Sequence, residues 1–171
     1  RQSALVREDK EHFAEIIHYI TSHSRNSDIP LLPFSMAVAA PDPASVRPLM
    51  VTFNDALWYF QYFSCPKEEI ILEVLYYSAY SFSGLLQYYG ELQPGTTVLL
   101  YDVELLGRDE EFRKGYHKLL RLMEEKKLSN FTILCDTKVA IQTFLANYPE
   151  FRRRIFTRTF EVEDLSDEEV L

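Results

Sequence analysis

Two aspartates offer the clearest chemistry in this sequence, because each one directly follows a short apolar run. Thr96 to Tyr101 and Phe131 to Cys135 are continuous apolar segments of the kind that a parallel strand buried on both faces requires, and Asp102 and Asp136 come next. Side chains at the carboxyl ends of parallel strands meet at one edge of a sheet, where α/β proteins bind ligands. If the two strands are neighbours, this pair of carboxylates could hold Mg²⁺ for phosphoryl chemistry.

A purely structural explanation fits the same two acids. Asp102 would end its strand, and Asp136 would cap the helix that begins near Thr137, which is a common use of acidic residues. Lys138 is close enough to contact a phosphate, but no third acid stands at an offset typical of a metal site. Glycine-rich phosphate loops are absent from the sequence, and the histidines and two cysteines match no metal-ligand spacing. We therefore expect no catalytic residue and no cofactor, and enzymatic activity is the less favoured interpretation.

The basic cluster formed by Arg152, Arg153 and Arg154 is a second candidate for binding a phosphate or an acidic partner. Six acids lie among the last eleven residues, so neutralisation within the chain is the favoured interpretation. The whole chain has 18 Lys and Arg against 26 Asp and Glu, a formal net charge of −8. This charge argues against nucleic acid or an anionic membrane surface as the partner.

Aromatic residues are concentrated in one part of the chain. Twelve of the 24 aromatic residues lie between Phe53 and Tyr89, and a strand over 57–63 could not hide all its rings on one face. Something must cover the other rings: the amino-terminal helix, a second copy of the chain, a partner protein or an apolar ligand. The residues of this predicted interaction surface are Trp58, Tyr59, Phe60, Tyr62, Tyr76, Tyr77 and Tyr80.

The first 45 residues are predicted to form an arm outside the main domain. Apolar residues at helical spacing predict a helix over 8–23, and a proline-rich connector follows, in which SMAVAA could form a short strand. We place the boundary near Ser45, with a compact module over 46–171. No apolar run is long enough to cross a membrane, and no secretory signal is recognisable, so we expect a cytoplasmic protein. Because the sequence begins with Arg1 and not Met, we expect it to be part of a longer polypeptide.

The module is predicted to open with a β-hairpin over 47–63 that turns at Asn54 and Asp55. A helix from about Pro66 to Tyr77 is expected next, although residues 66–92 fit one helix, two helices or a segment that includes a strand. The remaining predicted elements are strands over 96–101, 131–135 and 155–162 and helices over 110–127 and 137–148. Strands joined by such helices pair in parallel. The predicted fold class is therefore α/β, a mixed sheet of about five strands with helices packed on it, preceded by the amino-terminal helical arm.

This layout over residues 46–171 resembles that of STAS (sulfate transporter and anti-sigma factor antagonist) domains. The similarity lies in the order of elements, including the strand that ends near Asp102, the helix over 110–127 and the strand FTILCD. The resemblance implies a non-enzymatic regulatory domain that binds partner proteins. In that family a hydroxyl in the turn after the third strand is a phosphorylation switch. No Ser or Thr occurs here between Thr97 and Ser129, so a switch would lie elsewhere.

These observations favour a non-enzymatic cytoplasmic module for regulation or protein interaction, which binds a partner or self-associates through its aromatic surface. One alternative is a Mg²⁺-dependent phosphoryl-transfer enzyme or phosphoacceptor domain that uses Asp102 and Asp136. Another is a carrier in which the aromatic side chains line a pocket for a small apolar ligand.

Overall fold

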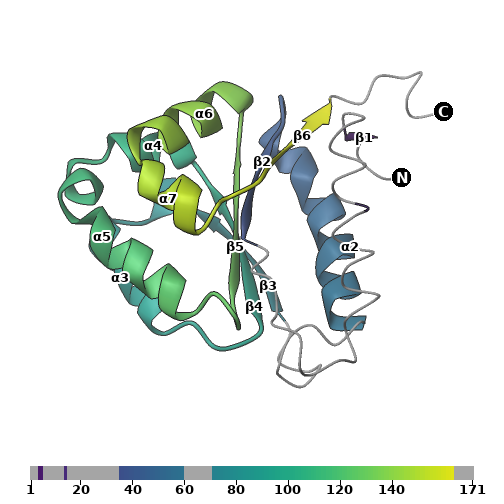
Figure 1. Cartoon of the computed structure of the whole chain (residues 1–171), viewed down its shortest axis with the longest axis horizontal. Coiled ribbons are helices and arrows are strands. Elements are labelled where there is room, and N and C mark those ends of the chain that lie inside the picture. Colours follow the sequence, from purple (N-terminus) through teal and green to yellow (C-terminus); the bar gives the residue numbers. More distant parts are fainter. Residues whose placement is uncertain (1–3, 6–13, 15–34, 60–70, 164–171) are drawn as a thin grey trace.

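A parallel β-sheet lies at the centre of the protein (Figure 1). The structure, a computed structural model, describes residues 4–5, 14, 35–59 and 71–163. The strands are β1 (Ala4–Leu5), β2 (Met36–Ala39), β3 (Ile71–Tyr76), β4 (Thr96–Tyr101), β5 (Phe131–Asp136) and β6 (Thr159–Glu163). Their order in the sheet is β1-β6-β2-β5-β4-β3. All neighbours pair in parallel except β1, which pairs with β6 in the antiparallel direction, so the α/β class with a mixed sheet is confirmed.

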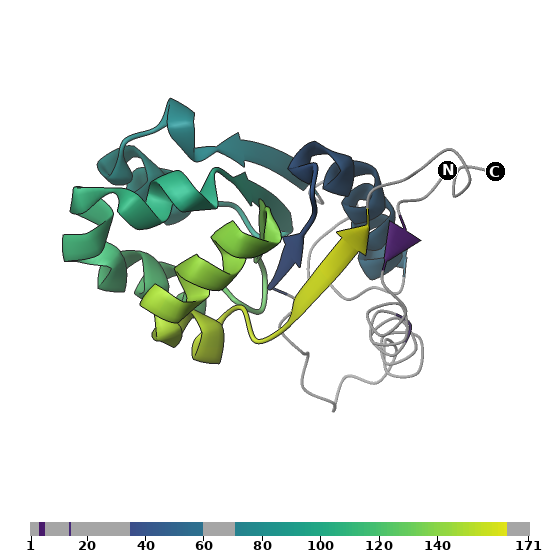
Figure 2. The ribbon, with the colours of Figure 1, turned by 90° about the horizontal axis from the view of Figure 1, so that it is seen from above.

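Helices cover both faces of the sheet (Figures 1 and 2). On one face lies α2 (Val46–Tyr59). On the other lie α3 (Phe82–Gly90), α4 (Val103–Arg108), α5 (Glu110–Glu125), α6 (Lys138–Asn147) and α7 (Pro149–Arg154). Two short 3₁₀ helices, η1 (Pro43–Ser45) and η3 (Tyr77–Ala79), follow β2 and β3. None of the helices in the described part of the chain is long and apolar enough to cross a membrane.

The uneven division of helices follows from the strand order. Crossovers between parallel strands are right-handed, so a connection that moves one way across the sheet and one that moves back lie on opposite faces. The connection from β2 to β3 moves outward to the edge of the sheet, whereas the connections from β3 to β4, β5 and β6 all move back. The helix α2 therefore lies on the face opposite α3 to α7.

The larger core layer is rich in aromatic rings. Phe112 of α5 is fully buried, with its ring centroid 4.9 Å from that of Tyr148, 5.5 Å from Phe82 and 5.8 Å from Phe144. Phe82 belongs to α3, Phe144 to α6 and Tyr148 to the C-terminal cap of α6, so the ring of Phe112 connects three helices of this face. The pairs of Phe112 with Phe82 and with Tyr148 are edge-to-face, and such pairs add packing energy beyond the burial of their area.

The predicted β-hairpin over 47–63 is wrong over 47–59, because residues 46–59 form the helix α2, and residues 60–63 lie outside the described residues. The apolar residues Val46, Leu49, Met50 and Phe53 are buried and recur at helical spacing. Asn54, predicted to turn the chain, is buried, and its Oδ1 accepts a hydrogen bond from Thr97 Oγ1 of β4 at 2.8 Å. The aromatic and β-branched residues suggested strands, but the buried stripe and this bond to the sheet favour the helix.

The amino-terminal boundary also differs from the prediction. Residues 36–39, placed in the connector before residue 46, form β2 in the interior of the sheet, between β5 and β6. The strand that SMAVAA allowed is therefore part of the module. The predicted helix over 8–23 lies outside the described residues apart from Ala14.

The sequence of 66–92 fits helices or a segment with a strand, and the structure contains both a strand and a helix there. Residues 71–76 form β3, where a helix was favoured, and a helix begins only at Phe82. The segment over 66–70 lies outside the described residues. The predicted strands over 96–101 and 131–135 and the helices over 110–127 and 137–148 are confirmed as β4, β5, α5 and α6. The last strand forms only at Thr159–Glu163, because α7 occupies residues up to 154.

We predict that Phe112→Ala lowers the free energy of unfolding by about 3–5 kcal/mol, because it removes the ring shared by α3, α5 and α6 and leaves a cavity. Urea unfolding followed by circular dichroism measures the change. Val139→Ala, at an exposed position in α6, is the control and should change stability by less than about 0.5 kcal/mol. A loss below about 1 kcal/mol for Phe112→Ala would mean that the ring cluster is not tightly packed.

Asn54→Ala should cost about 1–3 kcal/mol, because it leaves the buried Thr97 hydroxyl without its acceptor. In a double-mutant cycle with Thr97→Val, measured by urea unfolding, the combined loss should be clearly smaller than the sum of the single losses. Additive effects would show that the hydrogen bond between α2 and β4 does not contribute to stability.

Candidate functional site at the carboxyl edge of the sheet

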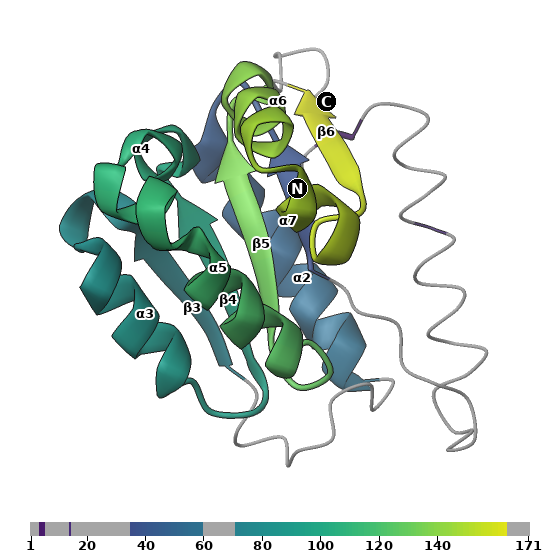
Figure 3. The ribbon, with the colours of Figure 1, turned by 60° about the vertical axis from the view of Figure 1, so that its left-hand side comes forward.

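The two predicted aspartates do come to the same edge of the sheet. β4 and β5 are direct neighbours, so the residues that end them lie side by side at the carboxyl edge (Figure 3). The same edge receives the ends of β2 and β3, followed by η1 and η3. This is the edge at which open α/β sheets bind ligands.

Asp102, which precedes the first residue of α4, has an unusual backbone conformation. Its φ angle is 63°, in the left-handed region that Asp and Asn tolerate better than most residues. Its carboxylate Oδ2 accepts a hydrogen bond from the Ser78 backbone N–H at 3.1 Å. Asp102 therefore fixes η3 against the end of β4, and its expected role in ending the strand is confirmed.

Asp136 binds the next loop in the same way. Its Oδ1 accepts from its neighbour Thr137 N–H at 2.7 Å, and its Oδ2 accepts from Glu104 N–H in α4 at 3.1 Å. The capping residue of α6 is Thr137, whose Oγ1 accepts from Ala140 N–H at 3.3 Å, so the prediction that Asp136 caps this helix is wrong by one residue. Among the described residues no group of three or more His, Cys, Asp and Glu is arranged to hold a metal ion.

Lys138 does not join the two aspartates in an ion pair. Its Nζ lies 2.8 Å from Glu161 Oε1 of β6, and this hydrogen bond raises the pKa of Lys138. The predicted phosphate contact at Lys138 would therefore compete with a carboxylate that already pairs with it.

The loop after β2 lies where the strand order reverses, and it is rich in proline. Pro41 and Pro43 have no backbone N–H, and Asp42 caps η1 by accepting from Ala44 N–H at 3.3 Å through Oδ1. The Asp42 carbonyl also accepts from Ser45 N–H at 3.0 Å. This loop is not among the predicted site residues, although its lack of glycine and lysine is visible in the sequence.

The predicted aromatic surface is only partly present in the described structure. Tyr77 is 3% exposed, so its predicted place on an exposed surface is wrong. Its hydroxyl donates a hydrogen bond to the Asp109 carboxylate, and burial and this bond raise the pKa of Tyr77. Tyr76 and Tyr80 are exposed, at 46% and 41%. The side chains of Trp58, Tyr59, Phe60 and Tyr62 lie outside the described residues.

Tyr76 lies against Tyr101 of β4, with ring centroids 4.8 Å apart and planes at 22°. The thiol of Cys135 lies beside Tyr101, and burial raises the pKa of both groups. Cys135 is therefore an inert, protonated thiol at neutral pH, as its position in an apolar strand predicts.

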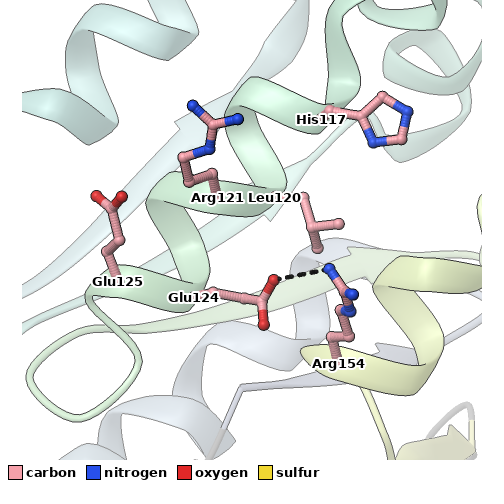
Figure 4. Close-up of a pocket in the computed structure, with 6 residues that line it drawn as sticks. All are labelled: His117, Leu120, Arg121, Glu124, Glu125 and Arg154. Atoms are coloured by element: carbon pink, nitrogen blue, oxygen red, sulfur yellow. Dashed lines mark hydrogen bonds and ion pairs between the residues drawn. The ribbon is translucent and has the colours of Figure 1, made fainter.

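The basic cluster belongs to a different part of the molecule. A cavity of about 380 Å³ between α5 and α7 is lined by His117, Leu120, Arg121, Glu124, Glu125 and Arg154 (Figure 4). Arg154 Nη1 lies 3.1 Å from Glu124 Oε1 and 4.0 Å from Glu150 Oε2. Arg152 and Arg153 are exposed. Acids of both helices thus pair with Arg154 and reduce the attraction of this cavity for an anion.

Comparisons with known proteins bear on the fold. No model of a protein family matches the sequence, and no curated protein matches it. Among solved structures, the Aeropyrum pernix ORC2 protein, solved in ADPNP-ADP complexes, is similar with a TM-score of 0.60 and 12% sequence identity. The match covers 99% of this chain and 51% of that one, so the chain spans about half the length of its structural neighbour. At this identity the similarity shows the α/β fold alone, and the STAS resemblance stays a prediction.

We predict that Asp102→Ala lowers the free energy of unfolding by about 1–3 kcal/mol, because alanine tolerates the left-handed conformation poorly and leaves Ser78 N–H without its acceptor. Asp102→Asn should cost less, since asparagine adopts this conformation and keeps an accepting oxygen. Urea unfolding of both variants measures the difference. Equal losses in the two variants would mean that neither the backbone conformation nor the hydrogen bond sets the role of Asp102.

Proposed function

We propose that this chain is a non-catalytic module for protein interaction and regulation. The observation that carries the proposal is the loop 40–45 after β2. Proteins that bind nucleotide phosphates on such sheets use a glycine-rich loop after a strand, whose backbone N–H groups point at the phosphates. The structural neighbour was solved with ADPNP and ADP. The loop 40–45 of the present chain contains two prolines and an aspartate and no glycine.

The loop 40–45 is poorly suited to a phosphate. Pro41 and Pro43 cannot donate, and the N–H of Ala44 already binds Asp42. The Asp42 carboxylate would repel a phosphate placed at the start of α2. Neither glycine nor lysine occurs between Ala40 and Pro48. These features support a binding role for the module over nucleotide hydrolysis.

The aspartates at the carboxyl edge support the same interpretation. Both carboxylates accept backbone hydrogen bonds that fix η3 and α4, which is a structural role. The exposed rings of Tyr76 and Tyr80 lie near them, and exposed aromatic residues are enriched at protein interfaces. The charged lining of the cavity between α5 and α7 does not favour the alternative of a carrier for an apolar ligand.

Isothermal titration with MgATP and MgADP tests the proposal. We expect no measurable heat of binding, corresponding to a dissociation constant weaker than about 1 mM. The Aeropyrum pernix protein is the positive control, because it was solved with these types of nucleotide. A dissociation constant below about 10 μM would contradict the proposal.

Titration with Mg²⁺ alone distinguishes the phosphoryl-transfer alternative. The thermal midpoints of the unmodified chain, Asp102→Asn and Asp136→Asn should not respond to the ion, because among the described residues no third ligand stands beside the two carboxylates to complete a metal site. A Mg²⁺-dependent rise in the midpoint that both substitutions abolish would favour that alternative and count against a non-catalytic module.

A further inference from the structure

Four exposed apolar side chains lie on elements at the carboxyl edge of the sheet. In the described part of the chain, the exposed large apolar residues are Val51, Ile71, Tyr76, Tyr80, Leu105, Leu128 and Val139. Four of these seven belong to this edge: Tyr76 and Tyr80 on either side of η3, Leu105 in α4 and Val139 in the first turn of α6. We call these four residues the carboxyl-edge patch. Leu105 is 49% exposed and Val139 is 71% exposed, so neither packs into the core.

The elements that carry the carboxyl-edge patch are held together. The Ser78 N–H binds Asp102, which joins η3 to the end of β4, and the Glu104 N–H binds Asp136, which joins α4 to the end of β5. Asp136 in turn binds the N–H of Thr137, the residue that caps α6. Figure 3 shows α4 and α6 together at the end of the sheet to which β3, β4 and β5 point. The patch is therefore a preformed surface.

Several carboxylates and one arginine, Arg47, whose charge acts on Tyr101, lie around the carboxyl-edge patch. Glu104 pairs with Arg108 at 2.7 Å and Lys138 pairs with Glu161 at 2.8 Å, so these charges offset one another. Within the described residues, the carboxylates of Asp42, Asp102 and Asp136 have no Lys or Arg within ion-pair distance. An ionised carboxylate has about four sites for accepting hydrogen bonds. The backbone N–H groups bound to these three acids do not fill those sites, so each can accept from a cation as well.

We propose that the carboxyl-edge patch docks a basic segment of a partner protein. Apolar side chains of this segment would cover Leu105 and Val139, and its Arg or Lys side chains would bind the carboxylates of Asp42, Asp102 and Asp136. Anionic partners are repelled by the same carboxylates. This inference rests on the proposed function and names the partner chemistry of the module.

Three short fluorescent peptides of equal length test the assignment: one of Arg and Leu, one of Glu and Leu, and one of Arg and Ser. Fluorescence anisotropy with the full chain should detect binding of the Arg and Leu peptide alone, because the docking surface needs both charge and apolar contact. The affinity should fall as salt is added, since exposed charges are screened.

Variants of exposed residues locate the binding surface without disturbing the core. Leu105→Ser combined with Val139→Ser should weaken binding of the Arg and Leu peptide by about tenfold or more. Val51→Ser combined with Leu128→Ser removes two apolar side chains of comparable exposure elsewhere, and should leave the affinity unchanged. Asp42→Asn, which changes charge and keeps a capping side chain, should weaken binding and reduce its dependence on salt.

The outcomes separate this inference from the proposed function. Equal binding of the Glu and Leu peptide, or loss of binding in the Val51 and Leu128 variant only, would overturn the basic partner at this edge. Failure of all three peptides to bind would overturn it as well. In each case the proposed non-catalytic module is judged separately, by the nucleotide titration.

A second copy of the chain is the remaining occupant to test. Sedimentation equilibrium of the full chain should show a monomer across the concentrations used for the peptides. A concentration-dependent assembly that the Leu105 and Val139 variant abolishes would show that a second copy covers the carboxyl-edge patch, and would overturn the proposal of a basic partner.

Discussion

The position of β2 between β5 and β6 is the constraint on which the rest of the structure depends. Both partners of β2 come from the last third of the described chain, so the interior of the sheet is completed by contacts between residues far apart in sequence. The Thr132 N–H, for example, donates to the hydroxyl of Ser35 at 2.9 Å. Such non-local strand pairing requires the closure of long loops, and the entropy cost of closing them comes before the strand contacts stabilise the sheet. The sheet therefore forms as a unit, and the separate amino-terminal connector expected from the prolines does not exist at residues 36–39.

This strand order also determines how the two faces are covered. A single described helix, α2, follows the outward connection to β3, and it is anchored to β4 by the buried bond between Asn54 and Thr97. The opposite face receives all the returning helices, whose aromatic rings meet around Phe112. One layer thus relies on aromatic packing among several helices, whereas the other relies on one helix and a polar bond to the sheet.

The same topology produces an edge that combines structural and functional features. Strand ends that run in parallel bring Asp102 and Asp136 together, and their carboxylates hold the following loops in place. In a phosphate-binding protein of this general form, backbone N–H groups after a strand would face the ligand. Here the loop after β2 carries prolines and Asp42, so the edge is acidic and presents apolar side chains. That combination is the basis of our proposal that the partner is a basic protein segment.

Elements whose signal lies in neighbouring residues, such as an apolar run or a helical period, can be predicted from the sequence. β4 and β5 could be predicted because every residue of TTVLLY and FTILC is apolar or small enough to be buried on both faces, and α5 because its apolar residues recur with the helical period. The proximity of Asp102 and Asp136 followed from the expected pairing of neighbouring strands.

Where a segment fits both a helix and a strand, only tertiary contacts determine which one forms. They also determine the hydrogen-bond partner of each buried polar group. In α2 the helical spacing of Val46, Leu49, Met50 and Phe53 competed with strong strand propensity, and the outcome depended on the surface of the sheet that buries them. The sequence groups Tyr77 with its exposed neighbours, but in the folded chain its hydroxyl donates a hydrogen bond to Asp109, which is 32 residues away in the sequence. Periodicity is a property of adjacent residues and can be found in the sequence, whereas burial and hydrogen bonding at these sites depend on contacts that exist only after the chain has folded.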